Sequence, residues 1–243
     1  MLEIGAGPGA LTEELAKRAG RVVAVELDEE LVTLTRRRLE AYTNLELLAA
    51  DVLDYTPLEL LEEGRGTAPY VACGNLPYYI TQPVVRRLIE ADPSPERIVV
   101  MMQREVAHRV VGGHGNESLL SISVRLYGQA ELMFELPPTA FWPPPKVHSA
   151  VVRIERWSEA PLVLDDTSRP RFFNVLRAGF SEPRKQFHNA IGNSLALPAP
   201  TILEVLAAAG IAPDVRAQHL DLDDWRRLHA TLEDLHPRTL DEQ

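Results

Sequence analysis

The segment Gly74–Ile80, with the sequence GNLPYYI, combines residue types that could hold a planar amine. The Asn75 side-chain oxygen and the main-chain carbonyl of Leu76 or Pro77 can accept hydrogen bonds from both hydrogens of an adenine amino group. Such acceptors would localise the nitrogen lone pair, which the ring otherwise delocalises, and direct it towards an electrophile. Pro77 stiffens the loop, and the ring of Tyr78 offers a face on which an extruded base can stack. The alternative is a plain turn that ends a strand, which would leave Tyr78 unexplained.

A second candidate is the glycine-rich segment LEIGAGPGALT, in which Gly5, Gly7 and Gly9 directly follow an apolar run. Glycine lets the main chain approach a ligand without a side chain in between, so the segment predicts a site for a nucleotide-like cofactor. The loop is weak support by itself, because Gly5, Gly7 and Ala10 also satisfy the dinucleotide fingerprint. A tight structural turn would use the same glycines.

Two acids follow the next apolar runs. Glu26 closes VVAVELDEE, about 20 residues after the glycine loop, where a carboxylate can accept both hydroxyls of a ribose. A helix-capping role is the alternative for Glu26, but Asp28 already fills it. Asp51, in LLAADVLDY, could accept a hydrogen bond from an adenine amino group. A methyl group on a sulfonium cofactor needs only alignment with the attacking nitrogen, so the loop and acids together predict methyl transfer to an adenine amine.

These residues must be positioned by a parallel sheet, because the carboxyl ends of its strands meet at one edge where ligands bind. The apolar runs predict strands at 2–4, 21–26, 45–50, 70–74 and 98–103, and residues 10–19 and 28–42 have helical periodicity. The runs AELMFEL and SAVVRIE, joined by a proline-rich loop, predict an antiparallel hairpin closing the sheet. We therefore expect an α/β fold: a doubly wound, Rossmann-like sheet of about seven strands.

After SEAPLVLDDTSRP the pattern becomes helical, in PRFFNVLRAGF, PRKQFHNAIGNSLA, PTILEVLAAAG and LDDWRRLHATL. The sequence predicts two domains, an α/β domain over residues 1–160 and a small all-helical domain over residues 165–243.

Composition narrows the function classes. The 243 residues are 45% hydrophobic, enough for a full core, and the net charge of −10 argues against indiscriminate coating of nucleic acid. The single cysteine, Cys73, excludes an internal disulfide framework and is interpreted as a core residue. The histidines do not pair at metal-ligand spacing, so no metal site is expected. The sequence has no uncharged apolar run of about 18 residues and no secretory leader, so we expect no membrane span and a cytoplasmic location.

The ordered motifs resemble the ribosomal RNA adenine N6,N6-dimethyltransferase family, most closely its bacterial small-subunit members. Besides LEIGAGPGALT, ELD, ADVL and NLPYYIT, the resemblance includes MMQREVAHRV, PPTAFWPPPKVHSAVVRI, RAGFSEPRKQFHNAIGN and AGIAPDVRAQHLDLDDW. It implies a class I methyltransferase sheet, a helical RNA-binding domain and S-adenosylmethionine as cofactor. The implied substrate is a pair of adjacent adenines in a hairpin loop near the 3′ end of 16S rRNA, each methylated twice on N6. A monomer acting on a pre-assembled 30S particle, with a role in small-subunit biogenesis, is also implied.

By this resemblance Gly5, Glu26, Asp51 and Asn75 contact the cofactor, and residues 75–78 position the amine. Phe180, in RAGFSEPRK, would be a second aromatic against the flipped base; its alternative is a core residue of the helical domain. Five cations are candidates for phosphate contacts, each with a solvated surface charge as its alternative: Arg104, Arg109, Lys146, Arg184 and Lys185.

The sequence departs from the family in two places. The chain starts after the position of the family's basic N-terminal segment, which puts cofactor affinity in question, and Pro183 stands where arginine is common. Three alternatives stay open: a truncated or non-catalytic ribosome-assembly factor that binds RNA, a large-subunit rRNA adenine N6-methyltransferase, and a dehydrogenase suggested by the glycine loop alone.

Overall fold

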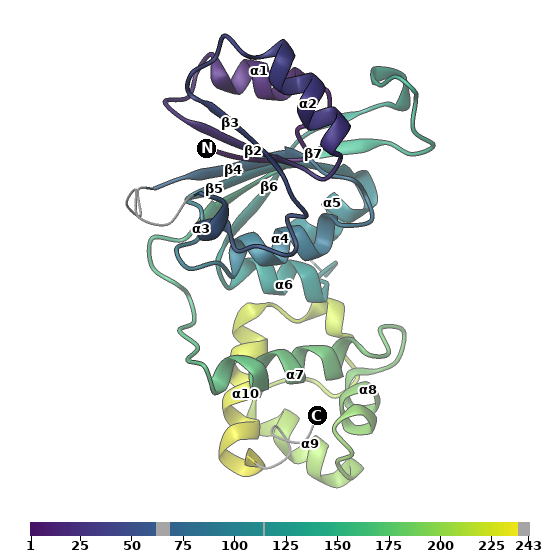
Figure 1. Ribbon diagram of the computed structural model, residues 1–243. Helices are drawn as coiled ribbons and strands as arrows, with labels where there is room; N and C mark the ends of the chain where they lie inside the picture. The colour runs from purple at the N-terminus through teal and green to yellow at the C-terminus, as the bar shows by residue number, and fades with distance from the viewer. Residues whose placement is uncertain (62–68, 114, 238–243) are drawn as a thin grey trace. The chain divides into compact units, whose positions relative to one another are not determined.

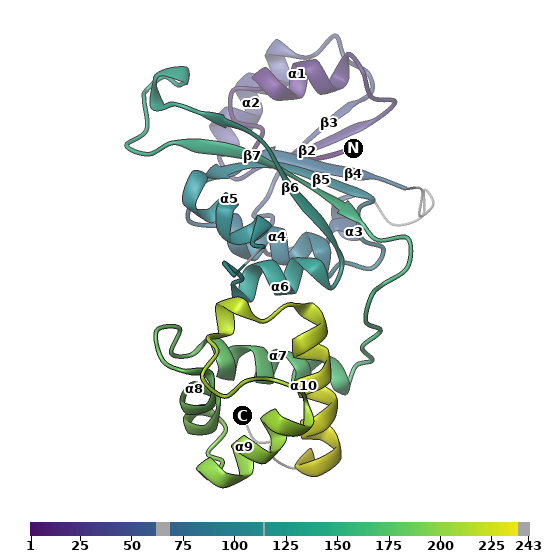
Figure 2. The same cartoon turned by 180° about the vertical axis from the view of Figure 1, so that it is seen from behind.

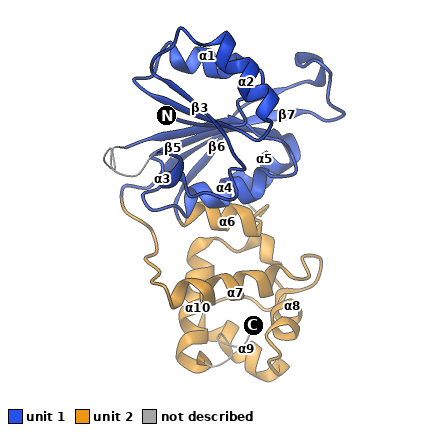
Figure 3. Ribbon diagram, viewed as in Figure 1, with its two compact units in different colours: residues 1–111, 127–158 blue, residues 112–126, 159–243 orange. Residues whose placement is uncertain are grey.

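The computed structural model describes residues 1–61, 69–113 and 115–237 and divides the chain into two compact units (Figure 3). The first unit holds residues 1–111 and 127–158, and the second holds 112–126 and 159–243. The last residues of the expected helical domain, 238–243, lie outside the described residues. Residues 112–126, expected in the first domain, group with the second unit, where the Glu117 amide donates to the Gln218 carbonyl at 2.9 Å and the Gln218 side chain donates to the Gly115 carbonyl at 3.0 Å.

The first unit is built on a seven-stranded sheet in the order β3-β2-β1-β4-β5-β7-β6 (Figure 1). The first five strands in sequence are parallel, and β6 and β7 form an antiparallel hairpin beside β5. This confirms the predicted fold class. The strands are β1 (Leu2–Ile4), β2 (Val22–Glu26), β3 (Leu45–Ala49), β4 (Val71–Asn75), β5 (Arg97–Gln103), β6 (Gly128–Leu136) and β7 (Ser149–Arg156).

Helices cover both faces of this sheet, with α1 and α2 on one face and α3, α4 and α5 on the other (Figures 1 and 2). Their bounds are α1 (Ala10–Ala16), α2 (Glu29–Arg38), α3 (Pro57–Leu60), α4 (Thr81–Ile89) and α5 (Arg104–Val111), and a 3₁₀ turn, η1 (Pro138–Ala140), follows β6. Because both faces of the sheet are buried, successive residues of its strands are apolar, and the sequence shows them as continuous apolar runs. Val22 and Ala24 pack with Val32 of α2, and each such buried aliphatic side chain stabilises the fold by roughly 1.5–3 kcal/mol.

The strand register brings the carboxyl ends of the strands to one edge. Ile4 pairs with both Val25 and Gly74, so the glycine loop leaves between the ends of β2 and β4. At the far side of the sheet, Gln103 pairs with Ser149, and Ser149 pairs with Leu136. The loop between β6 and β7 therefore leaves from this same carboxyl edge.

The second unit is helical, and its core is aromatic. Trp225 and Phe187 are fully buried and meet edge to face at 5.4 Å, and a Cβ on Gly179 would lie 2.4 Å from the Trp225 ring, so only glycine fits there. The elements are α6 (Leu119–Arg125), α7 (Ser168–Phe180), α8 (Phe187–Ser194), α9 (Ala199–Ala208), the 3₁₀ turn η2 (Ala217–His219) and α10 (Leu222–Leu235).

Within the described ranges no single helix has the length and apolar character to cross a membrane, although α8 and α9, bent by 118° at their break, would pass as a pair on length and composition.

Candidate active site

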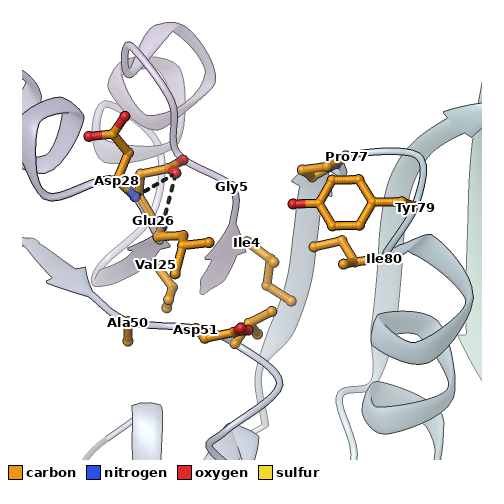
Figure 4. A pocket seen from close by; sticks show the side chains of 12 residues that line it. Ile4, Gly5, Val25, Glu26, Asp28, Ala50, Asp51, Pro77, Tyr79 and Ile80 are labelled. Atoms are coloured by element: carbon orange, nitrogen blue, oxygen red, sulfur yellow. Dashed lines mark hydrogen bonds between the residues drawn. The ribbon is translucent and has the colours of Figure 1, made fainter.

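A cavity of about 380 Å³ lies at the carboxyl edge of the sheet (Figure 4). It is enclosed by the loops that follow β1, β2, β3 and β4, as the sequence predicted for a ligand site of this fold. The lining residues are Ile4, Gly5, Val25, Glu26, Leu27, Asp28, Ala50, Asp51, Val52, Pro77, Tyr79 and Ile80. The structure thus brings Gly5, both predicted acids and Pro77 to one shared space. The other predicted site residues of the first unit's two loops are not among those that line it: Gly7, Gly9, Asn75, Leu76 and Tyr78.

The glycine loop is held in place by α2. Gly5 has a φ of 77°, and a Cβ there would lie 3.3 Å from the Asn75 carbonyl oxygen. Gly9 has a φ of 80°, and its Cβ would lie 2.6 Å from Thr35 Cγ2. The Thr35 hydroxyl donates to the Gly7 carbonyl at 2.9 Å. Side chains are excluded at these positions, so the loop can lie against both the asparagine segment and α2.

Glu26 is fixed by three main-chain donors at the end of β2. Its Oε2 accepts from the Gly7 amide at 2.8 Å, and its Oε1 accepts from the amides of Leu27 and Asp28 at 2.9 and 3.1 Å (Figure 4). Asp28 itself caps α2, accepting from Glu30 and Leu31, which agrees with the sequence-based division of roles between the two acids. Oε2 keeps one lone pair, so Glu26 can accept a further hydrogen bond from a ligand in the cavity.

Asp51 follows β3 and supplies the second acid of the cavity. Its Oδ1 accepts from the Leu53 amide at 2.9 Å, which leaves Oδ2 without a partner among the described residues. Glu26 and Asp51 therefore offer one acceptor oxygen each in a space whose other walls include Val25, Val52 and Ile80.

The two candidate carbonyl acceptors of the GNLPYYI segment differ in whether they already accept hydrogen bonds. The Pro77 carbonyl accepts from the Ile80 amide at 3.1 Å and from the Thr81 hydroxyl at 3.3 Å, so both of its lone pairs are used. The Leu76 carbonyl has no partner in the described part of the chain, and Leu76 as a whole residue is buried. Asn75 is exposed, and its side-chain amide is likewise unpaired within the described ranges.

The two tyrosines of the segment differ in their surroundings. Tyr78 is half-buried and its hydroxyl lies 2.9 Å from Ser149 Oγ, whereas Tyr79 lines the cavity and is 80% exposed. Figure 4 shows the Tyr79 ring beside Pro77 and Ile80 with its hydroxyl directed towards the space facing Gly5. Sequence reasoning did not select Tyr79; the doubled tyrosine of GNLPYYI was the available signal.

Three of the predicted phosphate-binding cations lie in the first unit. Arg104 begins α5, its amide donates to the His148 carbonyl at 3.0 Å, and its guanidinium lies 3.7 Å from Glu135. Arg109 lies on the same helix. Lys146 is exposed in the loop between β6 and β7, and its ammonium pairs with no described residue.

Phe180, Arg184 and Lys185 lie in the helical unit. Phe180 is half-buried, and its ring stacks on Trp225 with a centroid distance of 5.3 Å and an interplanar angle of 26°. Lys185 forms an ion pair with Glu182 at 2.6 Å, and Arg184 is exposed. All three lie in the helical unit, whereas the residues that line the cavity belong to the first unit.

Two buried titratable groups lie on neighbouring strands near the glycine loop. Glu3 of β1 is 1% exposed, its Oε2 has no hydrogen-bond partner among the described residues, and burial raises its pKa to about 7. Cys73, its register partner on β4, is also buried, and burial raises the pKa of its thiol to about 12. Such a thiol is protonated and unreactive at neutral pH. Glu3 was not singled out by the sequence, because a charged residue inside a three-residue strand gives no periodic signal.

Residues 1–234 match a family model described as Ribosomal RNA adenine dimethylase. Two curated relatives are each named Ribosomal RNA small subunit methyltransferase A. The relative from Dehalococcoides mccartyi (strain CBDB1) is 42% identical over 228 residues, which are 94% of this chain and 77% of that protein. The relative from Desulfitobacterium hafniense (strain DSM 10664 / DCB-2) is 42% identical over 229 residues, which are 93% of this chain and 79% of that protein.

Solved structures agree with this match. A dimethyladenosine transferase from Plasmodium falciparum superposes with a TM-score of 0.77 at 28% identity, covering 96% of this chain and 89% of its own. The 23S rRNA methyltransferase ErmE superposes with a TM-score of 0.72 at 28% identity, covering 96% of this chain and 90% of its own.

Proposed function

Because the chain belongs to the ribosomal RNA adenine dimethylase family, we propose that it transfers methyl groups from S-adenosylmethionine to adenines of small-subunit rRNA. The atoms methylated are the N6 nitrogens of two adjacent adenines in a hairpin loop near the 3′ end of 16S rRNA, each of which becomes N6,N6-dimethyladenosine. The observation that carries the proposal is the shared cavity, which Gly5, Glu26, Asp51 and Pro77 line together.

The cavity fits a nucleoside-containing cofactor. Its volume of about 380 Å³ lies in the range of small-molecule sites, and its lining combines apolar walls with three carboxylates, those of Glu26, Asp28 and Asp51. Through Oε2, Glu26 would accept a hydrogen bond from a ribose hydroxyl, Asp51 would accept one from the adenine amino group, and the glycine loop lets the main chain approach without side chains. When bound, the cofactor supplies a methyl group on a sulfonium centre. Transfer of that group requires alignment and no metal.

The target amine would be held by two unused acceptors. The Asn75 side-chain oxygen and the Leu76 carbonyl are both free of partners among the described residues, whereas the Pro77 carbonyl is occupied. We therefore assign the second hydrogen of the amine to Leu76, with Pro77 serving to stiffen the loop. Accepting both hydrogens localises the nitrogen lone pair towards the methyl group. Tyr78, held by Ser149, would present its ring to the extruded base.

RNA contacts would come from local cations, since the chain as a whole carries a net charge of −10. Arg104, Arg109 and Lys146 in the first unit, and Arg184 and Lys185 in the second, are proposed to contact phosphates. Phe180, which is half-buried and stacks on Trp225, is proposed to be the second aromatic that contacts the flipped base.

The small-subunit substrate is favoured over the large-subunit one by the relatives. Identity to the two small-subunit enzymes is 42%, against 28% to the 23S rRNA methyltransferase structure. A non-catalytic assembly factor would have no use for the fixed acids of the cavity. We further propose that the protein acts as a monomer in the cytoplasm, on a pre-assembled 30S particle, during small-subunit biogenesis.

Mass spectrometry of small-subunit RNA tests the function. Subunits from cells lacking this methylation are incubated with the protein and isotopically labelled cofactor, and the 3′-terminal fragment is analysed. We expect two adjacent dimethylated adenines that carry the label. If the protein binds the cofactor by calorimetry but no label enters the 16S rRNA, the non-catalytic alternative is supported. Label in the 23S rRNA of large subunits incubated in parallel would support the large-subunit alternative.

A further inference from the structure

The hairpin of β6 and β7 ends in an apolar surface that no described residue covers. Trp142 is 95% exposed, and Phe134, Met133 and Val147 are 54%, 42% and 37% exposed. Figures 1 and 2 show the end of this hairpin projecting beyond the other strands. Large apolar side chains that are exposed along one hairpin make it a candidate interaction site. We name residues 133–148 the Trp142 arm.

The arm is built to hold its shape. A register shift between Leu132 and Phe134 makes Met133 an extra residue in β6, and such a bulge twists the strand and redirects its side chains. The loop that follows contains five prolines: Pro137, Pro138, Pro143, Pro144 and Pro145. Proline restricts the backbone, so less conformational entropy is lost when a partner binds. The prolines therefore restrict the backbone that carries the exposed indole.

The charge of the arm's loop selects the class of partner. Residues 137–148 contain Lys146 and His148 and no aspartate or glutamate, although the chain as a whole is strongly acidic. The Lys146 ammonium is exposed and has no ion-pair partner among the described residues. An aromatic face beside an unpaired cation is the combination that binds single-stranded nucleic acid, where bases stack and phosphates are neutralised.

The arm is also continuous with the candidate active site. It leaves from the carboxyl edge of the sheet, and Ser149, the first residue of β7 after the arm, lies 2.9 Å from the Tyr78 hydroxyl. The His148 carbonyl accepts from the Arg104 amide, so both neighbouring loops fix the base of the arm. If a base of an RNA strand were bound at the cavity, the nucleotides next to it would lie against the same unit that carries the Trp142 arm.

We propose that the Trp142 arm binds a single-stranded segment of the RNA substrate that flanks the target adenines, with one base stacked on Trp142 and a phosphate beside Lys146. This rests on the proposed function and adds a substrate contact outside the cavity. Aromatic stacking is the means by which proteins read unpaired bases of RNA. The alternatives to RNA as the ligand of the Trp142 arm are a protein partner and a second copy of the chain.

The test measures binding to unmethylated small ribosomal subunits by co-sedimentation at several salt concentrations. Trp142→Ala should raise the Kd about tenfold, the effect of losing one stacked base, and Trp142→Phe should restore most of the affinity. Leu34→Ala, which removes another exposed apolar side chain of the first unit, should leave the Kd unchanged. Lys146→Ala should lower the slope of log K against log salt by about one, whereas Trp142→Ala should not change that slope.

Two controls separate the possible failures. Calorimetry with S-adenosylhomocysteine should give the same affinity for all variants, which shows that the cavity is intact. A photoreactive benzoylphenylalanine in place of Trp142 should cross-link to RNA; cross-links to a ribosomal protein or to a second copy would overturn the proposal. If the unaltered chain methylates the subunits and Trp142→Ala binds them equally well, only this inference fails. If the unaltered chain neither binds nor methylates them, the proposed function fails first.

Discussion

The Tyr78 hydroxyl lies 2.9 Å from Ser149 Oγ, and Ser149 is fully buried at the start of β7. This contact joins the GNLPYYI segment to the far side of the sheet, 71 residues further along the chain. It fixes the Tyr78 ring while the Tyr79 ring stays free over the cavity. The following predictions start from this arrangement.

Tyr78→Phe keeps the aromatic face but leaves the buried Ser149 hydroxyl without its partner. We expect the free energy of unfolding to fall by about 1–3 kcal/mol, the cost of an unsatisfied buried polar group, and methyl transfer to slow because the ring is less well held. The double variant Tyr78→Phe with Ser149→Ala should recover part of the stability. A double-mutant cycle by chemical denaturation measures the coupling, and strictly additive effects would show that the contact contributes nothing.

Asn75→Ala removes the proposed side-chain acceptor of the target amine. Methyl transfer to unmethylated small subunits should be abolished, because the lone pair is then no longer localised by two acceptors. Cofactor binding should stay measurable by calorimetry, since the Asn75 side chain is absent from the residues that line the cavity. Turnover at the rate of the unaltered chain would remove Asn75 from the reaction.

Glu26→Gln replaces a carboxylate that accepts from three main-chain amides. One oxygen becomes an NH₂ group that cannot accept, so the side chain must turn and the acceptor for the ribose is lost. We expect the Kd for S-adenosylmethionine to rise at least about tenfold, or ~1.4 kcal/mol. Glu29→Gln, an exposed acid in the first turn of α2, is the matched control and should bind normally.

Tyr79→Ala opens the wall of the cavity opposite the glycine loop. The ring would contribute apolar contact and water exclusion to a bound cofactor, so we expect a several-fold weaker Kd for both S-adenosylmethionine and S-adenosylhomocysteine. Tyr79→Phe separates the ring from the hydroxyl and should retain most of the affinity. Equal affinity of Tyr79→Ala and the unaltered chain in calorimetry would show that the ring plays no part in binding.

Glu3 should make stability depend on pH. Burial raises its pKa from the ordinary 4.5 to about 7, so between these values the folded chain holds a proton that the unfolded chain has lost. The Glu3 contribution to stability is therefore fully present below about pH 4.5 and decreases as the pH rises to about 7, by on the order of 3 kcal/mol. Glu3→Gln should be more stable than the unaltered chain at pH 8 and should flatten the profile over this interval. Parallel denaturation profiles of the two proteins would contradict the assignment.

The strands were predictable because apolar runs are local features of the sequence. The positions of Glu26 and Asp51 followed from them, because ligands bind at the carboxyl ends of parallel strands. Tyr79 was not predictable, because the direction of each ring depends on how the loop turns into α4. The choice between the Leu76 and Pro77 carbonyls was open for the same reason. It depends on which carbonyl the first turn of α4 uses.

The sequence also could not predict that residues 112–126 belong to the helical unit. The Glu117 amide donates to the Gln218 carbonyl, and the Gln218 side chain donates to the Gly115 carbonyl. Gln218 lies about a hundred residues later in the chain, so no local pattern predicts these contacts.

Because residues 112–126 group with the helical unit, the chain passes between the units at three points, near residues 111, 126 and 158. A single cut after residue 158 would leave α6 attached to a body that lacks its hydrogen-bonding partners, and would strip the separated helical piece of one of its own helices. Chimeras that exchange the helical unit between related enzymes therefore need two grafts, and a library of simple C-terminal swaps would sample mostly misassembled proteins.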